Sequence, residues 1–96
     1  MKIVFHEYAV NELNDAIDYY NLEVPGLGSV FKEEIRKSIN RIKEYPESWP
    51  IMVKSIHKYL LHKFPYKVLY SIETDHIYII AIAHQHRKPN YWIERK

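Results

Sequence analysis

The stretch Ile77-Tyr78-Ile79-Ile80-Ala81-Ile82-Ala83 leads directly into His84-Gln85-His86-Arg87-Lys88-Pro89-Asn90-Tyr91-Trp92. Seven apolar residues in succession, mostly β-branched or aromatic, predict a strand buried on both faces, because a strand with one solvated face would alternate apolar and polar residues. A buried strand holds the groups at its end more rigidly than a free loop does. The functional site is therefore expected where this strand ends.

The same stretch predicts which side chains share a face of the strand. Alternation along the strand gives two sets of four: Ile77, Ile79, Ala81 and Ala83 on one face, and Tyr78, Ile80, Ile82 and His84 on the other. Small side chains allow a helix to approach closely. We therefore expect the face with the two alanines to lie against helices.

The first half of the chain predicts a strand followed by two helices. Residues 2–5 are short and β-branched in composition, which is typical of a strand. Apolar residues recur at helical spacing over 7–22 and again over 27–45, and the turn expected at 23–28 holds both glycines. Two adjacent amphipathic helices joined by a short turn are expected to pack antiparallel.

The second half predicts a sheet on which these helices pack. Strand composition recurs over 52–56, 58–64 and 66–72, and the short connections make consecutive strands antiparallel. At 96 residues the chain has room for one core, so we expect a single domain over 1–96. The predicted fold class is α+β: an N-terminal strand and an antiparallel helical hairpin packed on a mainly antiparallel sheet.

The turn Glu73-Thr74-Asp75-His76 predicts the pairing of the last two strands. If the register follows this hairpin, Tyr66 and Lys67 come close to His84 and His86 at one end of the sheet.

Charge is distributed unevenly along the chain, whose net charge is +2. Residues 1–47 carry six Lys or Arg and nine Asp or Glu, and residues 48–96 carry eight and three. No acid lies between Glu47 and Glu73. This asymmetry fits either a basic face for a polyanion or an acidic peptide, or a solvated strand edge protected by lysines.

Composition excludes several classes of site. The absence of cysteine excludes disulfides, thiolate zinc sites and cysteine nucleophiles, and it fits a reducing cytoplasm. The N-terminal apolar run is too short for a signal peptide, and no segment is long enough to span a membrane. We expect a cytoplasmic protein without a membrane partner.

The residues after Ala83 offer candidate chemistry. His84 and His86 would share a face if the strand continued, but a metal site needs a third ligand and the sequence offers none, so no metal or cofactor is expected. Imidazole titrates near neutral pH and can act as a general acid or base on a phosphodiester. Nearby cations, Lys67, Arg87 and Lys88, could stabilise the charge on phosphorus.

Each of these residues also has a structural interpretation. Tyr91 and Trp92 can stack on nucleotide bases, or they can fold back over the end of a small core. Arg87 can form an ion pair with the acidic first helix instead of contacting a ligand.

The order of these elements, with Phe64-Pro65-Tyr66-Lys67-Val68-Leu69-Tyr70 and the ending Ala83-His84-Gln85-His86-Arg87-Lys88-Pro89-Asn90-Tyr91-Trp92, resembles the RelE/ParE toxin superfamily. The ending is closer to the ParE-like branch. The resemblance implies a toxin of a type II toxin–antitoxin pair, neutralised by direct binding of a cognate antitoxin. ParE-type members inhibit DNA gyrase without being nucleases, whereas RelE-type members cut mRNA on the ribosome.

The resemblance implies two alternative uses of the site residues. A RelE-type endonuclease would use a catalytic set of Lys67, His84, His86, Arg87 and Tyr91, although a lysine at position 67 lacks the two-pronged guanidinium that the family's arginine offers to phosphate. A gyrase-binding toxin would use its cationic and aromatic ending, and the expected binding residues are Lys63, Tyr66, Lys88 and Trp92. A third alternative is a member that binds its antitoxin but has lost toxicity.

Overall fold

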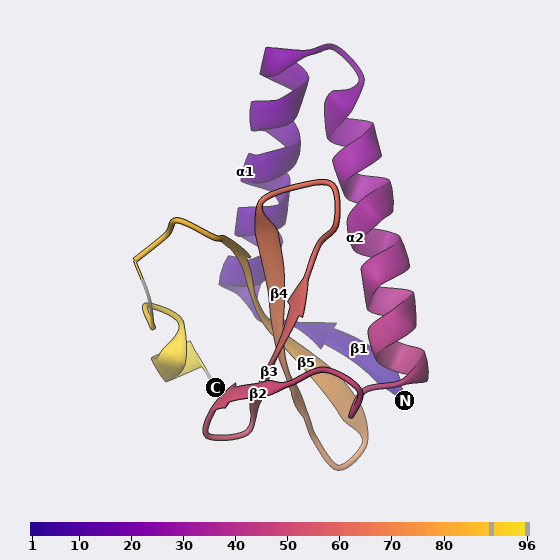
Figure 1. The fold of residues 1–96 in the computed structure, drawn as a ribbon, viewed down its shortest axis with the longest axis vertical. Helices are drawn as coiled ribbons and strands as arrows, with labels where there is room; N and C mark the ends of the chain where they lie inside the picture. The colour runs from indigo at the N-terminus through magenta and orange to yellow at the C-terminus, as the bar shows by residue number, and fades with distance from the viewer. Residues whose placement is uncertain (89, 96) are drawn as a thin grey trace.

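The computed structural model describes residues 1–88 and 90–95, so Pro89 of the C-terminal motif lies outside the described residues. The elements run in the order β1 (Lys2–Phe5), α1 (Glu7–Glu23), α2 (Leu27–Glu44), β2 (Ile51–Val53), β3 (Ile56–Leu60), β4 (Tyr66–Ile72), β5 (His76–His84) and the 3-10 turn η1 (Ile93–Arg95). The predicted α+β fold is confirmed. Figure 1 shows the two helices as an antiparallel hairpin beside the sheet.

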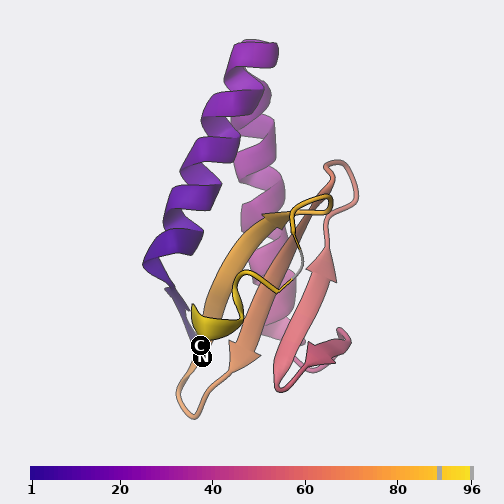
Figure 2. The same cartoon turned by 90° about the vertical axis from the view of Figure 1, so that its left-hand side faces the viewer.

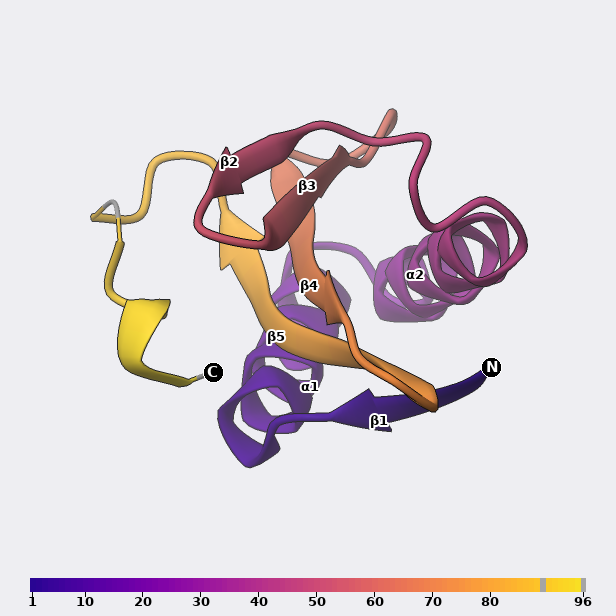
Figure 3. The same ribbon diagram turned by 90° about the horizontal axis from the view of Figure 1, so that it is seen from below.

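The five strands form one sheet in the order β1-β5-β4-β3-β2. β1 runs parallel to β5, and the other neighbours are antiparallel. The helices cover one face of this sheet, and the C-terminal segment, defined as residues 85–88 and 90–95, crosses the other (Figure 2). Figure 3 shows the same layers from below.

Both outer strands are shorter than their neighbours. β1 pairs only with His76 to Ile79, so the second half of β5 continues without a strand on its outer side. β2 pairs only with Ile56 and His57, so β3 also extends beyond its neighbour. The sheet therefore has two incompletely covered edges, one on β5 and one on β3.

A β-bulge in β5 overturns the predicted assignment of its faces. Leu69 of β4 lies opposite Ala81, but the next residue, Tyr70, lies opposite Ile79, so Ile80 is an extra residue in β5. The extra residue inverts the alternation beyond it. The helices cover Ile77, Ile79 and Ile82, whereas Ile80, Ala81 and Ala83 form a second core with Trp92. The expectation that the alanines lie against the helices was wrong.

The strands at the other edge are also displaced from their predicted ranges. β2 and β3 cover Ile51–Val53 and Ile56–Leu60 instead of 52–56 and 58–64. Lys54 has a φ of 54°, in the left-handed region, so the chain turns between the two strands at a position that the composition places inside the first one. In contrast, the predicted bounds of β4 are confirmed.

The helices reach the sheet through a mixed aromatic and aliphatic core. Phe31 of α2 lies 5.0 Å from both Phe64 and Tyr66, measured between ring centroids. Gly28 is needed where the helices meet, because a Cβ on it would lie 2.4 Å from the carbonyl oxygen of Ile17. No helix in the described part of the chain is long and apolar enough to span a bilayer.

Candidate functional site at the end of strand β5

A cleft of about 260 Å³ lies beside the second half of β5, beyond the residues of β5 that pair with β1. α1, the sheet and the C-terminal segment enclose it, and we call it the β5 cleft. Its lining residues are Glu12, Asp15, Ala16, Tyr19, Tyr66, Ile82, His84, Arg87 and Tyr91. The predicted location of the site, at the end of the buried strand, thus coincides with a hollow in the structure.

Glu12 of α1 organises the wall of this cleft. Its carboxylate accepts a hydrogen bond from the backbone N–H of Ile82 at 3.0 Å and another from the Tyr91 hydroxyl at 2.8 Å. The Arg95 guanidinium donates two more, at 2.9 and 3.0 Å, in a bidentate ion pair. The Glu12 side chain is only 15% exposed and the Arg95 side chain only 12%, so water screens this ion pair weakly.

Arg95 also forms a hydrogen bond with the backbone of β5. Its guanidinium donates to the carbonyl of Ile80 at 3.2 Å, while Glu12 accepts from Ile82 on the same side of β5. These two backbone groups point away from β4, where a further strand would pair with them. Glu12 and Arg95 together therefore replace part of a missing strand at this edge.

Cations stack on the aromatic rings of the segment. The Arg87 guanidinium lies 4.3 Å from the centroid of the Tyr91 ring, and that of Arg95 lies 5.0 Å from the same ring. Burial raises the pKa of Tyr91 strongly, and the hydrogen bond to the Glu12 carboxylate raises it further. Tyr91 therefore stays protonated at neutral pH and serves as a hydrogen-bond donor.

The two histidines lie at the rim of the cleft. β5 ends at His84, so His86 is on the turn that follows and is exposed. The backbone N–H of His86 donates to Nδ1 of His84 at 3.1 Å, and the ring centroids are 5.3 Å apart. The Tyr66 ring lies 5.0 Å from that of His84, and the two residues pair across the strands, so the predicted proximity of Tyr66 to His84 is confirmed.

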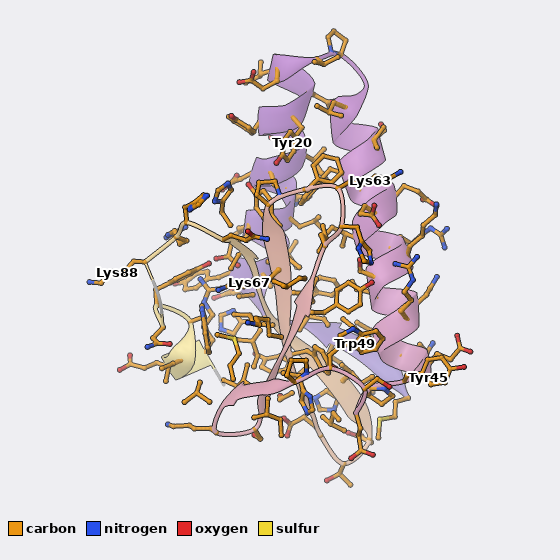
Figure 4. All side chains as sticks on the ribbon, in the orientation of Figure 1. Tyr20, Tyr45, Trp49, Lys63, Lys67 and Lys88 are labelled. Atoms are coloured by element: carbon orange, nitrogen blue, oxygen red, sulfur yellow. The ribbon has the colours of Figure 1, made fainter. Side chains whose placement is uncertain are left out.

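Lys67 lies at the same end of the sheet but on the other face. It pairs with Ala83, one residue along from the pair of Tyr66 and His84. Since Tyr66 faces the helices, alternation directs Lys67 toward the side of the C-terminal segment, where Figure 4 shows it. Of the expected catalytic set, His84, Arg87 and Tyr91 line the cleft and His86 adjoins it, whereas Lys67 is on the far side of the sheet.

The four expected binding residues do not form one surface. Lys63 lines a separate hollow with residues of α2, and Lys88 extends outward from the opposite side of the molecule (Figure 4). Tyr66 lies in the β5 cleft. Trp92 is 1% exposed and packs in the second core, which favours the alternative that it covers the core.

Glu12 and Arg95 are the residues that sequence reasoning missed. The acidic first helix does form an ion pair with the C-terminal segment, but with Arg95 and not with Arg87. A signal for Glu12 was present, since it lies three residues after Ala9 and four before Ala16, and both alanines are buried. An acid at helical spacing among buried residues indicates a buried partner.

One comparison with known proteins shows the family of this chain, and another shows its fold. The family model described as the ParE toxin of the type II toxin–antitoxin system parDE matches residues 3–89. A solved structure described as a chromosomal ParDE TA system from P. aeruginosa superposes with a TM-score of 0.78 at 16% identity, covering 88% of this chain and 95% of that one. No curated protein sequence matches. This chain belongs to the ParE toxin family of type II toxin–antitoxin systems.

Proposed function

We propose that the chain inhibits DNA gyrase through protein contact, in the cytoplasm, and that a cognate antitoxin neutralises it by direct binding. The family supports the role of a toxin, and the similar solved structure is that of a toxin–antitoxin system. One observation carries the choice of a binding mechanism over an endonuclease. Of the groups that would have to act on a phosphodiester, Tyr91 is bonded to Glu12, Arg87 stacks on Tyr91, and Lys67 lies on the other face of the sheet.

The charges of the β5 cleft support the same choice. Glu12 and Asp15 both line it, and carboxylates repel the phosphates of a nucleic acid. The Tyr91 hydroxyl already donates a hydrogen bond to Glu12, so it is not free to bond a reacting oxygen. Lys67 cannot assist from the far face. A phosphodiester in this cleft would lack a set of converging cations.

The outer turn offers a surface for protein contact. His86, Arg87 and Lys88 are all exposed there, immediately after the rigid end of β5. Arg87 is held by its stacking on Tyr91, which is itself fixed to α1 through Glu12. Fixed cations lose little conformational entropy when a partner binds. We propose this turn as the part of the toxin that contacts gyrase.

The test is supercoiling by purified gyrase in the presence of the purified chain. The double variant Arg87→Ala/Lys88→Ala is expected to need about tenfold more protein for the same inhibition, because it loses the exposed cations of the turn. The matched control is Lys32→Ala/Lys43→Ala, which removes two exposed cations from α2 and is expected to inhibit as the unmodified chain does.

The alternative target gives a different result in a parallel assay. If the unmodified chain leaves gyrase active but cuts ribosome-bound mRNA, and His86→Ala abolishes the cuts while antitoxin binding is kept, the chain is an endonuclease. If neither process is affected and growth continues, the chain binds an antitoxin without being toxic.

A further inference from the structure

The outer edge of β5 continues past the two side chains that bond it. Those bonds use the C=O of Ile80 and the N–H of Ile82. In an antiparallel pair, both polar groups of one residue point the same way, and every second residue repeats that direction. The C=O of Ile82 and the N–H of His84 therefore also point outward. In agreement, the N–H of Gln85 points the other way and donates to the carbonyl of Pro65 at 2.8 Å.

The spacing of these two outward groups fits a single amino-acid residue. In a parallel pair of strands, one residue donates its N–H to a carbonyl of the neighbour and accepts from the N–H two residues further along. The C=O of Ile82 and the N–H of His84 form such a pair, and both residues line the β5 cleft. At about 260 Å³, the cleft is smaller than the roughly 300–1,000 Å³ of sites for drug-sized ligands, so it suits a smaller molecule.

Opposite charges flank these backbone groups. Asp15 of α1 lines the cleft, is exposed, and forms no hydrogen bond or ion pair with any described residue. The Arg87 guanidinium lines the cleft on the side of the C-terminal segment. Its stacking on Tyr91 uses the flat face of the guanidinium and leaves the N–H groups at its edge available. The cleft thus offers a carboxylate without a partner and a guanidinium with available donors.

The remaining walls add apolar and aromatic surface. Ala16 of α1 and Ile82 of β5 are both buried and line the cleft together with the rings of Tyr19 and Tyr66. Burial raises the pKa of Tyr66, and the neighbouring Tyr19 raises it further, so the Tyr66 hydroxyl stays uncharged at neutral pH. An apolar side chain can lie against these walls without meeting an unpaired charge.

We propose that the β5 cleft binds a free α-amino acid with an apolar side chain. Its ammonium group would donate to Asp15 and to the C=O of Ile82. Its carboxylate would accept from Arg87 and from the N–H of His84, and its side chain would lie against Ala16 and the tyrosine rings. This inference goes beyond the proposed function and does not depend on gyrase being the target.

The chemistry of the cleft favours a free amino acid over other small ligands. A nucleotide would bring its phosphate close to the Asp15 carboxylate, which repels it. Within residues 1–88 and 90–95, no group of three His, Asp or Glu side chains could hold a metal ion. The last residue of a peptide has no ammonium group, and the first has no carboxylate. Only a zwitterion matches both Asp15 and Arg87.

The experiment follows binding of L-leucine to the purified chain by calorimetry and by NMR titration. We expect saturable binding with a Kd below about 1 mM, accompanied by a shift of the His84 amide resonance. N-acetyl-L-leucine lacks the ammonium group, and L-leucinamide lacks the carboxylate. Each analogue should bind about tenfold more weakly, because it loses hydrogen bonds to a charged partner.

Two variants assign the two charges of the ligand to their partners. Asp15→Asn should weaken binding of L-leucine about tenfold and leave binding of N-acetyl-L-leucine unchanged. Arg87→Gln should weaken L-leucine by a similar factor and leave L-leucinamide unchanged. The matched control is Asp18→Asn, which removes an exposed acid of α1 that does not line the cleft and should keep the affinity within about twofold.

Several outcomes would overturn the inference. L-leucine that moves no resonance at about ten times the expected Kd would do so. Equal binding of N-acetyl-L-leucine would assign the cleft to the end of a peptide chain, and equal binding of L-leucinamide to its beginning. An equal effect of Asp15→Asn and Asp18→Asn would exclude a direct contact with Asp15. No gyrase or antitoxin is present in these measurements, so their failure leaves the proposed function intact, and a chain that spares gyrase can still bind L-leucine.

Discussion

The two edges of the sheet differ in how their unpaired backbone groups are treated. On β5, beyond the end of β1, side chains of Glu12 and Arg95 bond the carbonyl of Ile80 and the N–H of Ile82. On β3, beyond the end of β2, the outward groups of Leu60 face a hollow lined with cations and aromatic rings. Uncovered edges are liabilities unless they are blocked or used. The difference shows which edge this toxin closes with its own side chains and which edge it leaves without such a cover.

The edge on β5, which we call the closed edge in contrast to the open edge on β3, depends on charges that are mostly shielded from water. Desolvating an ion pair is costly, and the cost is offset only when the pair and its remaining hydrogen-bonding sites are satisfied. Glu12 meets this condition with bonds from Ile82, Tyr91 and Arg95. The open edge has exposed, hydrated cations that carry little such cost. Five predictions on four variants test this contrast, and the variants are given in order of decreasing effect on stability.

Trp92→Ala should have the largest effect, because it empties a fully buried indole site in the second core. We expect a loss of about 4 kcal/mol in the free energy of unfolding, measured by urea denaturation. Trp49→Ala, at the open edge, removes a half-buried indole and should cost clearly less. Equal losses for the two variants would contradict the view that the C-terminal segment is part of the core.

Glu12→Ala should break the closed edge. It leaves Arg95 without its partner and Ile82 without an acceptor, so we expect a loss of about 3 kcal/mol. The measurement is again urea denaturation, in a double-mutant cycle with Arg95→Met. A coupling energy near zero would show that the two side chains do not stabilise the fold together.

Tyr91→Phe should cost less, about 1.5 kcal/mol, because it removes one hydrogen bond to a carboxylate and keeps the ring under Arg87. Thermal unfolding near neutral pH gives the value. An unchanged melting temperature would contradict the hydrogen bond to Glu12.

The same variant has a defined effect at alkaline pH. The pKa of Tyr91 is raised in the folded chain, mainly by burial, so the unfolded chain loses this proton first as pH rises above about 10. Its contribution to stability is complete below that pH and declines above it. Tyr70, whose pKa burial raises to about 12, acts in the same direction. Stability of Tyr91→Phe should therefore fall less steeply above pH 10 than that of the unmodified chain.

Leu60→Thr should have the smallest effect, within about 0.5 kcal/mol, because the half-exposed side chain packs little in the free toxin. The measurement is thermal unfolding of the free toxin. A large loss would mean that the outer side of residues 58–60 already packs within the chain, which would remove the contrast with β5.

The sequence predicts local structure well, but it predicts poorly the irregularities that depend on contacts between distant parts of the chain. The bounds of β4, the helical hairpin and the antiparallel pairing of β4 with β5 follow from periodicity and turn chemistry. The bulge at Ile80 does not, because an extra residue in one strand is defined only against its partner. The site shows the same division. The end of the buried strand β5 was predicted. The ion pair of Glu12 with Arg95 was not, because it joins residues 83 positions apart and no local pattern indicates which cation reaches the helix.

The distance along the chain between Glu12 and Arg95 has a consequence for the kinetics of folding and unfolding. Contacts between distant parts of a chain require closure of a long loop, and they form late when local hairpins fold first. The hairpin of β4 and β5 can form locally, whereas the bond between Glu12 and Arg95 requires both the first helix and the last turn to be in place. Contacts that form after the transition state govern the rate of unfolding and leave the rate of folding almost unchanged. We therefore expect the ion pair at the edge of β5 to slow unfolding, so that the folded toxin persists longer.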